Sequence, residues 1–126
     1  MNFKYLEDVA KRAIILDEHG RIHFSPTILF EKRGIVQMVS MHAPLKTLRV
    51  IFKAIKRKIK PKNMAVICLV DYRNNTYLLI EKYKMVRVNG RRTWKKKSKV
   101  YAIIQLEDGF DLDEVKMEHK IALNID

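Results

Sequence analysis

The sequence predicts an α+β fold, with a single domain built on a mainly antiparallel sheet of about five strands, two or three helices and a long basic β-hairpin. Two segments place apolar residues at the three- and four-residue spacing of a buried helix face. Several β-branched and aromatic runs are separated by short turns. Asn89-Gly90 lies between two such runs, which is the strongest short-range hairpin signal. The 126 residues suffice for one core, so we expect residues 1–126 to form one domain.

Residues 2–13 are expected to form the first helix, because their apolar side chains gather on one face. These side chains are Phe3, Leu6, Val9, Ala10 and Ala13. Asn2 is suited to capping the start of the helix. The β-branched run 14–16 then leads into a turn at 17–20.

Residues 22–30 are expected to be extended. The run is interrupted at Pro26, which lacks a backbone N–H and therefore favours an edge position or a bulge. A turn at Arg33-Gly34 separates it from a further strand over 35–41.

Residues 44–60 show the clearest helical pattern, with Pro44 suited to the first helical position and Pro61 ending the helix. One stripe is apolar and consists of Leu45, Leu48, Phe52, Ile55 and Ile59. A neighbouring stripe is basic and consists of Lys46, Arg49, Lys53, Lys56, Arg57 and Lys60. The apolar stripe is expected to face the core.

Residues 64–70 are almost continuously apolar, as in a central strand that is buried on both faces. A turn is expected at 71–75, followed by two long strands over 76–88 and 92–106. Residues 111–123 are weakly patterned and are expected to form a final helix.

The two long strands have a predictable register. A two-residue turn at Asn89-Gly90 pairs Val88 with Arg91, and every further pair follows from it. Lys82 then lies opposite Lys97 and Lys84 opposite Lys95 on one face of the hairpin. Tyr83, Met85 and Trp94 lie on the other face, and the base of the hairpin is apolar on both faces.

The charge is concentrated in the middle of the chain, and the formal net charge is +12. The basic block, residues 44–100, holds eighteen of the 26 Lys and Arg residues but only two acidic ones, Asp71 and Glu81. The C-terminal segment 101–126 is acidic and is expected to cover part of the basic surface. The positive charges of the basic block repel one another unless an anionic partner is near.

These patterns predict a nucleic-acid-binding protein that binds DNA or RNA largely without sequence preference, through a basic hairpin arm and the basic helix stripe. Lysines would neutralise phosphates, and Tyr83 and Trp94 would stack on unpaired bases. The helix residues of the predicted site are Lys46, Arg49, Lys53, Lys56, Arg57 and Lys60. The hairpin residues are Lys82, Tyr83, Lys84, Arg87, Arg91, Arg92, Trp94, Lys95, Lys97 and Lys99.

Two alternatives remain open. In the first, Asp71 and Glu81 hold a divalent ion and the protein is a metal-dependent nuclease. This alternative is disfavoured because a tight turn would place the two carboxylates far apart. In the second, the protein is an interaction protein, of viral or mobile-element type, that binds an acidic protein partner. The charge pattern is also compatible with a solvated lysine face over an aromatic core face, which is a common arrangement in sheets, but nucleic-acid binding is favoured because the block has so few acidic residues.

Other polar groups give weaker signals. Asp17, His19 and His23 have a spacing that could hold a metal ion, but a polar hairpin turn with two solvent-exposed histidines is the favoured interpretation. Cys68 lies in an apolar run and is expected to be a buried filler. We therefore expect no catalytic residues, no metal and no cofactor.

The longest stretch without a charged residue, Gly34 to Leu45, has twelve residues, which is too short to span a membrane. A single cysteine and an N-terminus without an apolar run predict an intracellular, cytoplasmic protein with no membrane partner. The sequence leaves open DNA or RNA, single or double strand, and monomer or homodimer.

Overall fold

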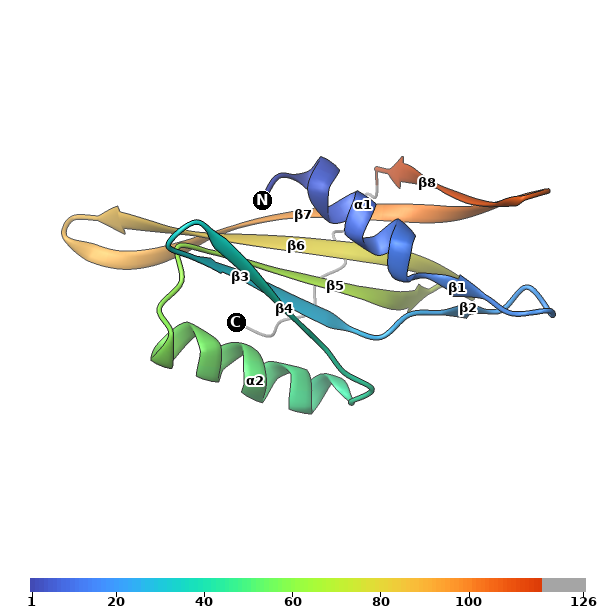
Figure 1. Cartoon of the computed structure of the whole chain (residues 1–126). Helices are drawn as coiled ribbons and strands as arrows, with labels where there is room; N and C mark the ends of the chain where they lie inside the picture. Colours follow the sequence, from blue (N-terminus) through green and yellow to red (C-terminus); the bar gives the residue numbers. More distant parts are fainter. Residues whose placement is uncertain (117–126) are drawn as a thin grey trace.

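The computed structural model describes residues 1–116. Its elements in chain order are α1 (Phe3–Ala13), β1 (Ile15–Leu16), β2 (Ile22–His23), β3 (Thr27–Lys32), β4 (Ile35–Ser40), α2 (Leu45–Lys58), β5 (Asn63–Tyr72), β6 (Asn75–Val88), β7 (Arg91–Leu106) and β8 (Gly109–Val115). Six strands form one antiparallel sheet in the order β4-β3-β5-β6-β7-β8, and β1 pairs with β2 in a small separate sheet. Helix α1 covers one face of the large sheet and α2 the other (Figure 1).

Two hydrophobic cores lie on either side of the sheet. Leu6 and Ala10 of α1 pack on one face, and Leu48 and Phe52 of α2 pack on the other. Strand β5 contributes to both cores, because successive side chains of a strand point to opposite faces. The expected central strand, buried on both faces, is therefore confirmed.

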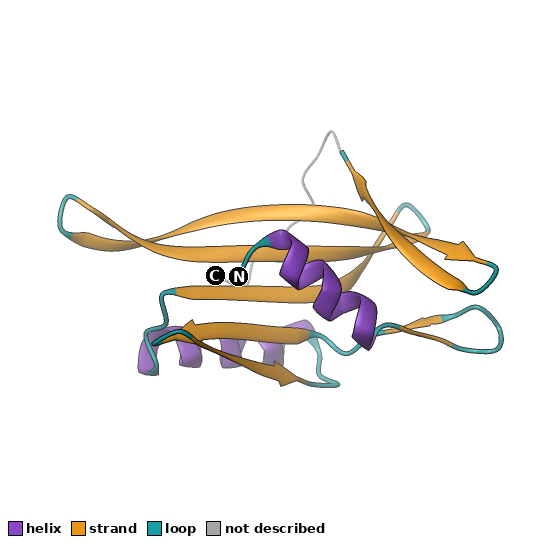
Figure 2. Ribbon diagram, turned by 45° about the horizontal axis from the view of Figure 1, so that its top comes forward, coloured by secondary structure: helices purple, strands orange, loops and turns teal. Residues whose placement is uncertain are grey.

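The α+β class and the antiparallel pairing are confirmed, but the strand count is not. The main sheet has six strands rather than about five, and it twists and curls along its width (Figure 2). The additional strand is β8, which occupies the start of the segment expected to form a final helix. Phe110 and Leu112 alternate with acidic residues and pack on the α1-side core. This alternation of apolar and polar residues is typical of a strand, and here it outweighs the weak helical pattern. The remainder of that expected helix, 117–123, lies outside the described residues.

Three local expectations are also corrected. Pro26 precedes β3, and β3 is an inner strand rather than an edge. The proline is accommodated because it lies outside the ladder and its carbonyl accepts a hydrogen bond from Met41 N–H at 3.0 Å. Pro44 is the N-cap of α2 and not its first residue. The β5–β6 turn consists of Arg73 and Asn74 alone, both at positive φ.

The β6–β7 hairpin is confirmed pair by pair. The register runs from Tyr77–Ala102 to Val88–Arg91. Asn89 and Gly90 have φ values of 51° and 78°, as a two-residue turn with two left-handed positions requires. Pairing with β5 ends at Lys84, so residues 85–94 form a two-stranded extension, which we call the arm.

Candidate nucleic-acid interface

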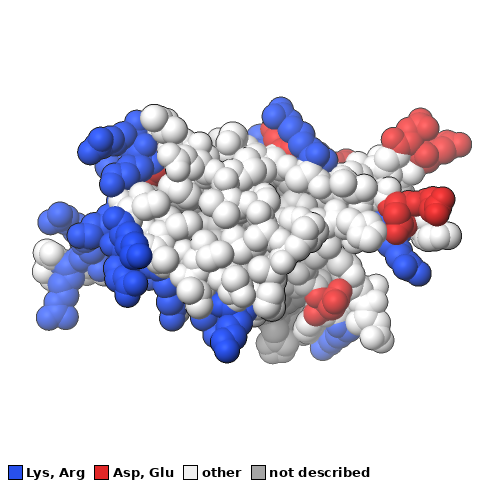
Figure 3. Space-filling model, turned by 60° about the horizontal axis from the view of Figure 1, so that its bottom comes forward, with Lys and Arg blue, Asp and Glu red and all other residues white. Residues whose placement is uncertain are grey.

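The charged side chains are segregated along the length of the sheet. Lys and Arg gather at one end of the molecule and acidic residues at the other (Figure 3). The basic end comprises the arm, with Arg87, Arg91 and Arg92, the lysine pairs at the base of the arm, and the last turn of α2, with its three basic residues. The acidic end comprises the β1–β2 and β7–β8 turns. This separation gives the molecule one end that attracts anions.

The sheet divides the predicted site residues between its two faces. The lysine ladder, which consists of Lys82, Lys84, Lys95, Lys97 and Lys99, lies on the α1 face. The ammonium groups of Lys82 and Lys99 each lie 4.7 Å from the ring centroid of Phe3 in α1. The basic stripe of α2 lies on the opposite face, so the ladder and the stripe do not form one continuous surface.

The ladder consists of like charges that lie directly opposite each other across the hairpin. Lys82 pairs with Lys97, and Lys84 pairs with Lys95. Within residues 1–116, the only ladder lysine joined to a carboxylate is Lys99, whose Nζ lies 3.5 Å from Glu114 Oε2. Burial, followed by the charges of Lys97, Lys84 and Lys99, lowers the pKa of Lys82. Keeping Lys82 charged beside the other ladder lysines is therefore electrostatically unfavourable.

A hollow of about 510 Å³ lies beside the ladder. Its lining includes Lys82, Lys84, Lys95 and Lys97 together with Met1, which precedes α1. This volume is typical of pockets that bind small molecules. The contributions of Met1 and Phe3 could not be predicted from the sequence, because only the packing of α1 on the sheet brings them to the ladder.

The opposite face of the hairpin is covered rather than exposed. Tyr83 is 1% exposed, and its ring centroid lies 4.8 Å from that of Phe52 in α2. Its hydroxyl donates to Glu81 Oε2 at 3.0 Å, and Lys96 Nζ lies 3.4 Å from the same oxygen. The expectation that Tyr83 stacks on bases is therefore wrong, because β6 is still paired with β5 at this position and α2 covers it.

Trp94 is half-buried at the margin of the α2-side core. The ammonium of Lys56 lies 5.7 Å from its ring centroid, so α2 and the arm are in contact. Arg49 is also half-buried, and its Nε is buried with no hydrogen-bond partner among the described residues. The exposed members of the predicted helix stripe are Lys46, Lys53 and Arg57 on α2 and Lys60, which follows the end of the helix at a φ of 53°.

Asp71 and Glu81 are not brought together. Asp71 is exposed beside the β5–β6 turn and accepts a hydrogen bond from the Thr76 hydroxyl at 2.8 Å. Glu81 is fully buried and pairs with Val66, five positions along β5 from Asp71. At ~3.3 Å per residue the two sites are about 16 Å apart along the strand. Residues 1–116 contain no group of three potential metal-ligating side chains.

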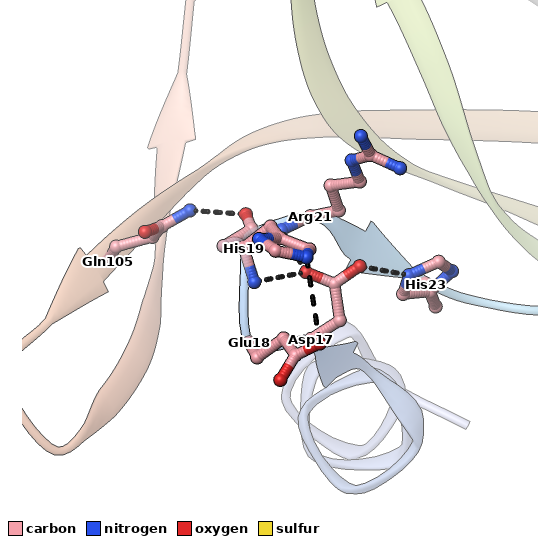
Figure 4. A network of polar contacts seen from close by, with 7 residues as sticks. Asp17, Glu18, His19, Arg21, His23 and Gln105 are labelled. Atoms are coloured by element: carbon pink, nitrogen blue, oxygen red, sulfur yellow. Dashed lines mark hydrogen bonds and ion pairs between the residues drawn. The ribbon is translucent and has the colours of Figure 1, made fainter.

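The turn between β1 and β2 contains Asp17, and hydrogen bonds between its own residues hold its shape (Figure 4). Asp17 Oδ1 accepts from the N–H groups of His19 and Arg21, both at 2.8 Å, and Oδ2 lies 2.9 Å from His23 Nε2. The His23 contact is the largest cause of a lowered Asp17 pKa. Gln105 donates to the Gly20 carbonyl at 2.9 Å, which attaches the turn to β7.

The side chains of Cys68 and Asp111 have structural surroundings that explain their positions. Cys68 is buried, and burial raises its pKa to about 12. Asp111 pairs with Lys11 of α1 at 3.0 Å. No helix within residues 1–116 has the length and apolar character needed to cross a membrane.

No protein-family model, curated protein or solved structure matches this chain. The function is therefore inferred from the charge, burial and geometry of the surface.

Proposed function

We propose that the protein binds nucleic acid through its basic end, largely without sequence preference. The observation that carries the proposal is the pairing of Lys82 with Lys97 and of Lys84 with Lys95, with no carboxylate contacting these four lysines within residues 1–116. Like charges opposite each other cost ~0.2–1 kcal/mol per pair in a sheet. The pairing of like charges does not itself stabilise the fold, whereas a polyanion would make it favourable by releasing its counterions.

The spacing of the ladder supports a phosphate backbone as the ligand. Lys82 and Lys84 are two residues apart on one face of β6, which corresponds to about 6.6 Å. This distance is about twice the 3.4 Å rise per nucleotide of one strand. Lysines act as point charges on phosphates and do not read base edges, so the ladder would confer affinity rather than sequence specificity. An acidic protein strand, whose alternate side chains also lie about 6.6 Å apart, is the alternative partner.

The ladder and the α2 stripe would contact different parts of the ligand, because they lie on opposite faces of the sheet. The arm links the two surfaces, with Arg91 on the ladder side and Arg87 and Arg92 on the α2 side. Charge reversals in the ladder and in the stripe should therefore weaken binding additively. The nuclease alternative is disfavoured by the separation of Asp71 from Glu81.

Fluorescence anisotropy with a labelled oligonucleotide, over a series of salt concentrations, tests the proposal. If about six phosphates are neutralised, the log–log slope of affinity against salt should be near −5. The double variant Lys84→Glu, Lys95→Glu should bind more than tenfold more weakly and with a shallower slope.

The matched control is the double variant Arg21→Glu, Arg73→Glu, which changes the net charge equally at the opposite end of the sheet. Its affinity should stay within about threefold of the wild type, since exposed charges beyond ~10 Å are largely screened at 0.1 M salt. An equal loss in both variants would show that net charge, and not the ladder, drives binding. Absence of binding at low salt would refute the proposal outright.

A further inference from the structure

The ladder ends at α1. From the arm inwards, its pairs are Lys84–Lys95 and Lys82–Lys97, followed by Lys99. The ring of Phe3 lies against the ammonium groups of Lys82 and Lys99, and Met1 borders the hollow beside the two pairs. A strand that follows the ladder from the arm therefore meets α1 and cannot continue straight along the sheet.

The hollow at this closed end concentrates positive charge. Four lysines from two strands line a volume of about 510 Å³. Lys82 is the most constrained of them, because Phe3 and three neighbouring lysines surround it. The lowered pKa of Lys82 indicates that burial and its neighbours disfavour its charged form, and a bound anion would offset both effects.

We propose that this hollow binds the terminal phosphate of a nucleic-acid strand, an inference that rests on the proposed nucleic-acid binding. A terminal phosphate monoester carries about −1.5 to −2 charges at pH 7 and three acceptor oxygens. An internal phosphodiester carries one charge and has a chain on both sides, which the closed end of the ladder does not accommodate. The site thus fits the end of a strand better than its middle.

The test uses four oligonucleotides of one sequence with an internal fluorophore. One carries a 5′-phosphate, one a 3′-phosphate, one has hydroxyl groups at both ends, and one is a closed circle. We expect one of the two phosphorylated oligonucleotides to bind about tenfold more tightly than the hydroxyl form, since its terminal phosphate brings extra charge and acceptor oxygens to the lysines. The circle should bind no more tightly than the hydroxyl form. Comparing the two phosphorylated arms identifies which end enters the hollow.

The double variant Lys82→Gln, Lys97→Gln should lose this preference. The matched control, Lys53→Gln, Arg57→Gln, lies on α2 on the opposite face and should weaken binding of all four oligonucleotides while keeping the preference. Equal, salt-dependent binding of all four by the wild type would overturn this inference but leave the proposed function standing. A preference that survives in Lys82→Gln, Lys97→Gln would also overturn it. No binding of any oligonucleotide would overturn the proposed function itself.

Discussion

Replacing Lys97 by glutamate should stabilise the fold and weaken nucleic-acid binding at the same time. Lys97 is exposed and lies directly opposite Lys82. The substitution changes a like-charge pair into an opposite-charge pair without touching either hydrophobic core. Opposite effects in the two assays are expected only if the ladder is maintained for a ligand rather than for stability.

The magnitude follows from the pairing. Removing the repulsion of a cross-strand pair is worth ~0.2–1 kcal/mol, and adding an attraction is worth a similar amount. The two effects together are worth about 0.4–2 kcal/mol. Because Lys97 is solvent-exposed, we take the middle of this combined range and expect a gain of about 1 kcal/mol in the free energy of unfolding. For a domain of this size, that raises Tm by about 4 °C. The new carboxylate should also raise the pKa of Lys82, because Lys97 is one of the charges that lower it.

Urea and thermal denaturation measure the stability change, and fluorescence anisotropy measures the loss of affinity. Lys97→Gln removes the repulsion without adding an attraction, so it should give about half of the gain. Arg73→Glu makes the same change in net charge at the far β5–β6 turn and should give little gain. If Lys97→Glu is neutral or destabilising, or if Arg73→Glu stabilises as much, the local repulsion that supports the proposed function is not present.

Three further predictions concern residues away from the ladder. Cys68 is buried and its pKa is raised to about 12, so near pH 8 a disulfide reagent should modify it only after unfolding in urea. Tyr83→Phe removes a hydrogen bond to the buried Glu81 and should cost about 1–3 kcal/mol in urea denaturation, with oligonucleotide affinity unchanged; loss of affinity instead would place Tyr83 in the interface. The pKa of Asp17 is lowered, chiefly by its hydrogen bond with His23, so its stabilising contribution is complete above about pH 4 and disappears as the pH falls through the folded-state pKa. The stability difference between wild type and Asp17→Asn should shrink accordingly in acid, and a constant difference would contradict this reasoning.

The hairpin could be predicted from sequence because one local signal fixes all of its pairs. Asn89-Gly90 specifies a two-residue turn, and each strand then alternates between the two faces. No long-range information is needed to place Lys82 opposite Lys97. The same reasoning shows why the β5–β6 turn was predicted too long, since arginine at a positive-φ position such as Arg73 gives no turn signal.

The burial of the hairpin could not be predicted in the same way. Alternation places Tyr83 and Trp94 on one face, but it does not say where β5 stops pairing or how far α2 extends over the sheet. These limits depend on contacts between distant segments, and they decide that Tyr83 is in the core while Trp94 is at its margin. Likewise, β8 forms because β7 offers it an edge, which residues 109–115 do not reveal by themselves.

The two cores explain how the fold can tolerate the ladder. The inner half of β6 is buried on both faces through Leu78, Leu79 and Ile80. Each such side chain stabilises the fold by ~1.5–3 kcal/mol when fully buried, whereas the two ladder pairs together cost about 0.4–2 kcal/mol. The burial of a single inner residue is therefore sufficient to offset both pairs.

Because the ladder lysines stand on the same strands as these buried residues, their Cα positions are fixed before any ligand arrives. Binding would then require ordering of the lysine side chains but no rearrangement of the backbone. An amide hydrogen-exchange experiment would test this. Saturation with an oligonucleotide should raise the protection of β6 residues 78–84 no more than that of the other core amides, since binding stabilises the whole fold and these amides are already paired with β5 or β7. A larger gain there than in the rest of the core would mean that the strands form only on binding.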